Sequence, residues 1–257
     1  MKKIAILSIF LLISSCTRSD YKFEILSGTK NLEAGNTEMN YQIKDGEEIL
    51  KSFAIVHEKI MHFIVVRNDL QDFQHLHPSY DENTGEFSID LNLPNEGDYR
   101  LFADFTPTGK KSPVTLFQDI TIGDAKDTEP VVIDSNNVKN TGDYEVTYSF
   151  PKEIEAGTAI KYTLEIKKAG IDVNNLEMYL GGLAHGLIIK KEDLDFIHSH
   201  NLNNDIKGPK IDFETVFPES GIYKIFTQFQ HEGQIITSEY VIEVKENKSG
   251  ASSSMKH

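Results

Sequence analysis

The segment MHFIVVRNDLQDFQHLHP, residues 61–78, decides the fold, because it is written a second time as AHGLIIKKEDLDFIHSHN, residues 184–201. Three histidines recur, each 123 positions further along: His62, His75 and His77 become His185, His198 and His200. The likeness continues outward, since LPNEGDYRLFADF at 93–105 corresponds to FPESGIYKIFTQF at 217–229. Self-similarity over about a hundred residues indicates a duplicated domain and not a short-period solenoid.

Each copy has the periodicity of β-strands. FSIDLNL and YRLFADF alternate apolar residues with others, and turn signals such as NTG, PNEG, PESG and HEG separate the runs. Several short strands with regular turns predict an all-β chain of two tandem immunoglobulin-like antiparallel β-sandwiches. The expected boundaries are 21–123 for the first sandwich, 124–139 for a linker, 140–246 for the second sandwich and 247–257 for a disordered tail.

The N-terminus has the pattern of a bacterial lipoprotein. Lys2 and Lys3 precede an apolar run too short to span a bilayer, and Ile-Ser-Ser-Cys ends at Cys16. We therefore expect residues 1–15 to be a signal peptide and Cys16 to carry the lipid that attaches the chain to a membrane. Residues 16–20 would form the lipidated N-terminus. Thr17 stands where an inner-membrane protein often carries Asp, which favours the outer membrane of the cell envelope, on either its periplasmic or its surface face.

Composition excludes several functions. The net charge of −14 is unfavourable for binding nucleic acid. Cys16 is the single cysteine, so the exported part can form neither a disulfide nor a thiolate metal site. The sequence contains no Gly-x-Ser-x-Gly elbow, His-Glu-x-x-His pair or P-loop. We expect no enzyme activity.

The repeated segment predicts a hairpin that gathers its histidines. Residues two apart share a strand face, so His75 and His77 point the same way. A register that places Ile64 opposite His75 places His62 opposite His77, and a slip of one residue would send His62 to the other face. In the first register we expect the imidazoles of His62 and His77 to approach within roughly 5 Å.

Three neutral imidazoles are a ligand set for Cu(II), Zn(II) or Ni(II). Copper leads the divalent affinity order and is the expected cofactor, with zinc and nickel as alternatives. Asp72 and Asp195 recur with the histidines and are candidates for holding an imidazole N–H. Met61 or Met178 can add a soft ligand for Cu(I). The second triad, His185, His198 and His200, is expected to form a second site of the same kind.

The alternative is that the histidines are structural, because duplication copies structural residues as faithfully as functional ones. The chain would then be a surface lipoprotein that acts as an adhesin or interaction scaffold. His57 lies outside the repeated set, since Leu180 occupies its place in the second copy. It is either an extra ligand for the first copy or an ordinary strand residue.

At MHFIVVRNDLQDFQHLHP and GDYRLFADF the sequence resembles bacterial exported domains called YtkA-like. The resemblance covers most of residues 50–122 and, more loosely, 178–245. It implies a small immunoglobulin-like sandwich in a copper or heavy-metal handling system, with a metal-transport or envelope protein as partner. The second copy departs from the pattern at Asn201, where the first has Pro78, and at Ala184, where the first has Met61.

Overall fold

The computed structural model describes residues 20–27, 33–124 and 130–247. The expected signal peptide, Cys16 and all of the expected tail except Asn247 lie outside these ranges. The described residues form strands connected by turns and contain no helix. Accordingly, within these ranges no helix of the length and apolar character needed to cross a membrane is found.

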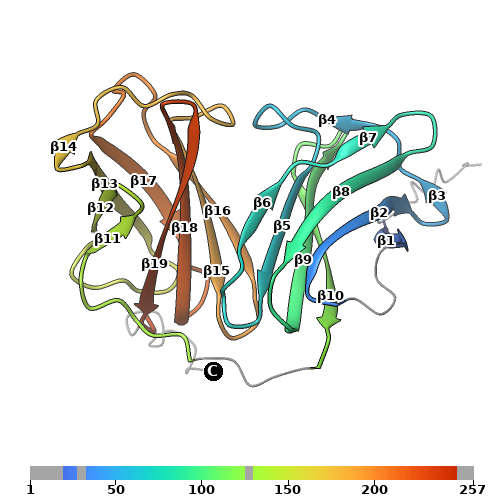
Figure 1. The fold of residues 1–257 in the computed structure, drawn as a ribbon, viewed down its shortest axis with the longest axis horizontal. Coiled ribbons are helices and arrows are strands. Elements are labelled where there is room, and N and C mark those ends of the chain that lie inside the picture. The colour runs from blue at the N-terminus through green and yellow to red at the C-terminus, as the bar shows by residue number, and fades with distance from the viewer. Residues whose placement is uncertain (1–19, 28–32, 125–129, 248–257) are drawn as a thin grey trace, which may run out of the picture.

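The first domain is an antiparallel sandwich of two sheets (Figure 1). One sheet contains β1 (Tyr21–Ser27), β2 (Gly35–Asp45), β3 (Glu48–Ile49), β7 (Ser79–Asp81) and β8 (Glu86–Leu93). The other contains β4 (Phe53–Ala54), β5 (His62–Arg67), β6 (Gln74–Leu76), β9 (Gly97–Pro107) and β10 (Val114–Ile122). Alternate residues of β2 and β8 are buried between the sheets, as the period of two predicts, whereas β9 is buried at every position from Leu101 to Pro107.

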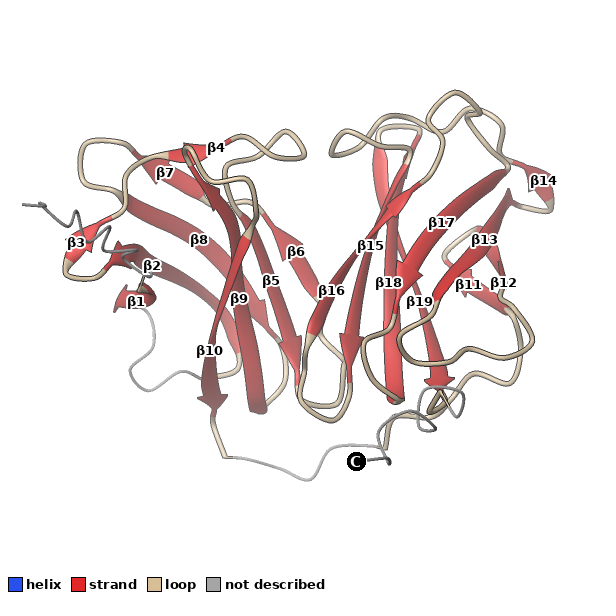
Figure 2. Ribbon diagram, turned by 180° about the vertical axis from the view of Figure 1, so that it is seen from behind, coloured by secondary structure: helices blue, strands red, loops and turns tan. Residues whose placement is uncertain are grey.

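The second domain repeats this strand order, with an additional edge strand and with an isolated bridge between Glu177 and Gln230 in place of β4 (Figure 2). Its strands are β11 (Val138–Thr141), β12 (Tyr144–Ser149), β13 (Ala159–Lys168), β14 (Ile171–Asp172), β15 (Ala184–Lys190), β16 (Phe196–Asn201), β17 (Lys210–Val216), β18 (Gly221–His231) and β19 (Gln234–Val244). The additional edge strand is β11, which lies beside β12. The prediction of two tandem β-sandwiches is confirmed. Strand β11 begins at Val138, inside the expected linker, and Asp134 of that linker is hydrogen-bonded to Val241.

The two domains differ at one corner. In the first, Pro78 separates β6 from β7, and these short strands belong to different sheets. In the second, Asn201 replaces proline, and β16 runs on to pair with both β15 and β17. Proline has no N–H to give to a ladder, whereas asparagine does. The second domain's hydrogen bonds thus join nine strands into a single folded sheet, whereas the first domain keeps two sheets.

A tyrosine corner is present in both domains. The Tyr99 hydroxyl donates to the carbonyl of Asn95 at 2.8 Å, and the Tyr223 hydroxyl donates to the carbonyl of Glu219 at 2.9 Å. A tyrosine bonded to backbone a few residues upstream is a hallmark of immunoglobulin-type sandwiches. The feature therefore supports both the fold class and the duplication.

The domains pack face to face, with β5 and β6 of the first beside β15 and β16 of the second (Figures 1 and 2). A separate apolar cluster fills this interface. Its fully or largely buried members are Ile64, Val66, Leu70, Phe102, Leu187, Ile189, Leu194 and Phe226, with Phe73, Val131 and Phe196 packed against them. Most of these residues are counterparts of one another in the repeat, so each domain uses the same patch to contact the other.

The contacts across the interface come in equivalent pairs. Phe73 stacks on Phe226 with ring centroids 4.0 Å apart, and Phe102 meets Phe196 at 5.7 Å. The polar contacts repeat in the same way: Arg100 Nη1 donates to the Asp193 carbonyl at 2.6 Å, and Lys224 Nζ donates to the Leu70 carbonyl at 2.7 Å. Such reciprocity is the signature of a twofold, isologous interface, here formed within one chain.

Candidate metal centre

The hairpin of β5 and β6 has the register that the sequence predicts. Ile64 lies opposite His75 and Phe63 lies opposite Leu76. Because successive side chains alternate, Met61 and Phe63 enter the core of the first sandwich, while His62 takes the outer face. Met61 is therefore not a candidate ligand, since its side chain is on the opposite face from the histidines.

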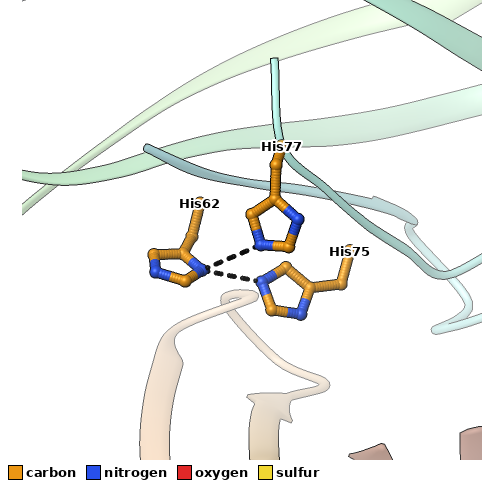
Figure 3. A group of neighbouring side chains, drawn as sticks. All are labelled: His62, His75 and His77. Carbon is orange, nitrogen blue, oxygen red and sulfur yellow. Dashed lines mark hydrogen bonds between the residues drawn. The ribbon is translucent and has the colours of Figure 1, made fainter. Parts of the chain in front are cut away.

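His62, His75 and His77 converge on one point (Figure 3). His62 Nδ1 lies 3.1 Å from His75 Nε2 and 3.3 Å from His77 Nε2. One ligand nitrogen from each ring lies within 4.8 Å of the other two. Nitrogens bound to a tetrahedral ion at about 2.0–2.1 Å lie about 3.3 Å apart. The expected approach of His62 and His77 is confirmed, and the three residues can hold a metal ion.

The outer nitrogens of two rings are fixed by oxygen acceptors. His62 Nε2 lies 3.1 Å from the carbonyl oxygen of Val56, and His75 Nδ1 lies 2.8 Å from Gln228 Oε1. The Gln228 amide is oriented by its nitrogen, which donates to Thr237 Oγ1. Because carbonyl oxygens only accept, each of these ring nitrogens carries the proton. The inner nitrogens of His62 and His75, which face one another, therefore present lone pairs.

Protonation does not relieve this opposition of lone pairs. Burial, followed by the neighbouring imidazoles, lowers the pKa of His75 well below its ordinary value. Burial lowers the pKa of His77 to about 4, with a further contribution from His62 and Lys59. The rings of His75 and His77 are thus neutral near pH 7, which is the form that ligates metals.

The second hairpin has the equivalent register. His185 lies opposite His200, and Leu187 lies opposite His198. The rings of His185 and His198 have centroids 5.3 Å apart, and burial lowers the pKa of His185 far below its ordinary value. The side chain of His200 is outside the described part of the structure. The structure thus brings two members of the second triad together.

The two histidine groups face each other across the domain interface. The His185 ring is nearly parallel to that of His62 at 5.9 Å and lies 5.4 Å from His75. Each group of histidines also has a polar partner from the other domain. Gln228 of the second domain bonds to His75 of the first, while Asp104 of the first lies 3.6 Å from His198 Nδ1 of the second. The groups expected as separate sites form one cluster.

Asp104 is a functional candidate that the sequence pattern did not indicate. Its side chain is buried on β9 directly beside His62, and Thr115 donates to its other carboxylate oxygen at 2.6 Å. Burial raises the Asp104 pKa to about 6. Gln228 occupies the equivalent position of β18 and was likewise missed, because neither residue belongs to the repeated histidine segment.

The expectation for Asp72 needs correction. Its carboxylate accepts from the Tyr99 hydroxyl at 2.6 Å and from Asn95 Nδ2, and it lies 3.6 Å from Arg67. The Asp72 carboxylate therefore stabilises the tyrosine corner and does not accept a hydrogen bond from an imidazole. The backbone carbonyl of Asp195 accepts from the amide of Lys190, within the β15–β16 connection. The imidazole N–H groups of His62 and His75 instead donate to the Val56 carbonyl and to Gln228 Oε1.

Comparison with known proteins places the chain in a family. Residues 17–121 and 138–246 each match Domain of unknown function (DUF8832), so the chain belongs to this family and contains the domain twice. A search of curated proteins found no match.

Similar solved structures share little sequence with the chain. Salmonella alpha-2-macroglobulin is 12% identical with a TM-score of 0.29, over 88% of this chain and only 15% of its own length. A marsupial T cell receptor is 9% identical (TM-score 0.26; 90% of this chain and 72% of that one). The fibronectin(III)-like modules of Clostridium thermocellum CbhA are 12% identical (TM-score 0.24; 92% and 97%). We draw no functional conclusion from likenesses at this level.

Proposed function

We propose that this protein is a lipid-anchored component of the cell envelope that binds a copper ion through His62, His75 and His77, for metal buffering or delivery. Its role is binding and not catalysis. The acidic surface attracts cations without selecting among them, so selection is left to the histidines.

One observation carries the proposal. His62 Nδ1 and His75 Nε2 face each other at 3.1 Å with their protons held on the far side of each ring by carbonyl oxygens. Two buried lone pairs in contact are unfavourable unless a cation lies between them. A structural pair of histidines would instead place a proton donor against an acceptor. The arrangement supports a metal site whose ligands are oriented in advance.

Copper is the preferred ion for three reasons. The ligands are imidazoles without thiolates, a set that suits copper, zinc and nickel, and copper binds most tightly of the divalent ions. The expected lipoprotein signal ending at Cys16 directs the chain to a compartment where bacteria encounter copper. The resemblance to YtkA-like domains of copper and heavy-metal systems supports the same choice, and a metal-transport protein of the envelope is the proposed recipient.

The test is the metal content of the protein purified without a histidine tag. After exposure to equimolar copper, zinc and nickel and removal of excess metal, we expect copper to predominate. The double variant His75→Ala, His77→Ala should lose at least one copper equivalent. His231→Gln is the control, because His231 bonds to Tyr144 and Asn175, away from the cluster. Copper content independent of these histidines would refute the proposal and favour the interaction scaffold.

A further inference from the structure

The turn between β4 and β5 carries a histidine that the repeat does not explain. A bridge between Val56 and Lys59 closes this turn, and His57 has a positive φ of 48°. The second domain repeats the turn, with Leu180 at the same place and a φ of 54°. The backbone is thus common to both copies, while the histidine side chain belongs to the first domain alone.

The His57 side chain lies beside histidines of both domains and is nearest to His185 of the second. Its ring centroid is 5.3 Å from His185, 6.0 Å from His62 and 6.3 Å from His198, and the rings of His185 and His198 are 5.3 Å apart. The turns of the two domains touch here, since a Cβ added to Gly181 would lie 4.0 Å from His57 Cα. A residue of the first domain is therefore placed to complete a set of three imidazoles with two from the second.

Two of the three ring separations in this set match the spacing of imidazoles that share one ion. Imidazoles that bind one tetrahedral ion through nitrogens at about 2.0–2.1 Å have ring centroids roughly 5.2 Å apart. In the first triad the three separations are 5.0, 5.1 and 5.3 Å. In the second set two separations are 5.3 Å and the third, between His57 and His198, is 6.3 Å, so a shared ion requires the half-buried His57 side chain to rotate toward His198.

We infer that His57, His185 and His198 form a second cation position beside the first, so that the chain holds one two-ion centre across its domain interface. This inference rests on the proposed function. It differs from the expectation of one independent site in each domain, because the second position needs a ligand from both domains. The nearly parallel rings of His62 and His185, with centroids 5.9 Å apart, lie between the two positions.

Asp104 supplies the charge that a second cation requires. Neutral imidazoles do not compensate two buried positive ions, and burial of uncompensated charge is costly. The Asp104 carboxylate is 5% exposed and lies 3.6 Å from His198 Nδ1, so its negative charge sits next to the second position.

The experiment is a copper titration of the full chain in detergent, without an added tag, read by metal analysis and by electron paramagnetic resonance of Cu(II). The wild type should bind two copper ions per chain whose signals are broadened by mutual coupling. His57→Leu should bind one copper with an uncoupled signal. Leucine is the natural occupant of the same turn in the second domain, so this variant should fold, as circular dichroism without metal would verify.

Each other outcome has a distinct meaning. One copper in the wild type, or two without coupling, would overturn the two-ion centre while leaving the proposed function in place. Two coupled coppers in His57→Leu would overturn the assignment of His57. Failure of the proposed function appears differently, as copper binding that His75→Ala with His77→Ala leaves unchanged.

Discussion

Gln228 lies in the second domain, yet its substitution should weaken copper binding at histidines of the first. Gln228 Oε1 accepts from His75 Nδ1 at 2.8 Å, and this bond directs the Nε2 lone pair of His75 toward His62. Gln228→Leu removes the acceptor and retains the bulk of the side chain. If the domains moved independently, the substitution would have no route by which to act on His75.

The magnitude follows from the role of the bond. Loss of a group that orients a ligating histidine typically lowers metal affinity about 10- to 100-fold, or about 1.4–2.7 kcal/mol. Both partners are buried, with 6% of Gln228 and 8% of His75 exposed, so solvent cannot replace the acceptor.

The assay is a competition titration with a copper chelator, performed on wild type, Gln228→Leu and two comparison variants. Gln230→Leu makes the same change two residues along β18, where the side chain bonds to Glu177, and should leave affinity unchanged. Gln228→Glu keeps an acceptor, as Asp104 does at the equivalent position, and should retain at least wild-type affinity. A change of less than threefold in Gln228→Leu would refute the interdomain orientation of His75.

Three further predictions follow from pKa, packing and sequence. The pKa of His77, about 4, keeps its ring neutral at pH values where an ordinary histidine is protonated. In a dialysis series, copper should therefore remain bound at pH 5 and dissociate near pH 4. Release at pH 6–7 would contradict the burial of His77. Phe226→Ala should cost roughly 3–5 kcal/mol in urea unfolding, since the buried ring stacks on Phe73, while Phe117→Ala, 57% exposed, should cost little. Cys16→Ser should leave a folded chain in the soluble fraction after cell lysis; persistence in the membrane fraction would show another attachment.

The sequence was sufficient for local structure and for register. Alternation and turn signals predicted strands, and the repeat predicted two sandwiches. The spacing of the histidines also predicted the register of the hairpin. His62 lies on the same face of the sheet as His75 and His77 only if the strands pair with Ile64 opposite His75, and a shift of one residue would place it on the other face. These inferences depend on periods of two and on self-similarity, both of which are visible in a single chain.

The domain interface was not predicted, although one signal pointed to it. Residues of β5 and β15 are apolar on both faces, a pattern typical of a strand covered on both sides. Ile64 and Leu187 occupy outer-face positions that solvent-facing strands usually give to polar residues. The cross-domain partners Asp104 and Gln228 depend on how the sandwiches dock, which is a property of long-range packing and not of local pattern.

Covalent fusion of two like domains has a consequence for assembly. A symmetric pair of separate chains associates only at sufficient concentration, whereas a linked pair meets at an effective concentration that short tethers place in the millimolar range. Each chain is then a complete unit at any concentration. Because the two domains belong to one chain, equivalent positions can also carry different residues: the first domain has Asp104 and His57 where the second has Gln228 and Leu180. A homodimer must repeat every substitution on both sides of its axis, so unequal positions of this kind are open only to a fused pair.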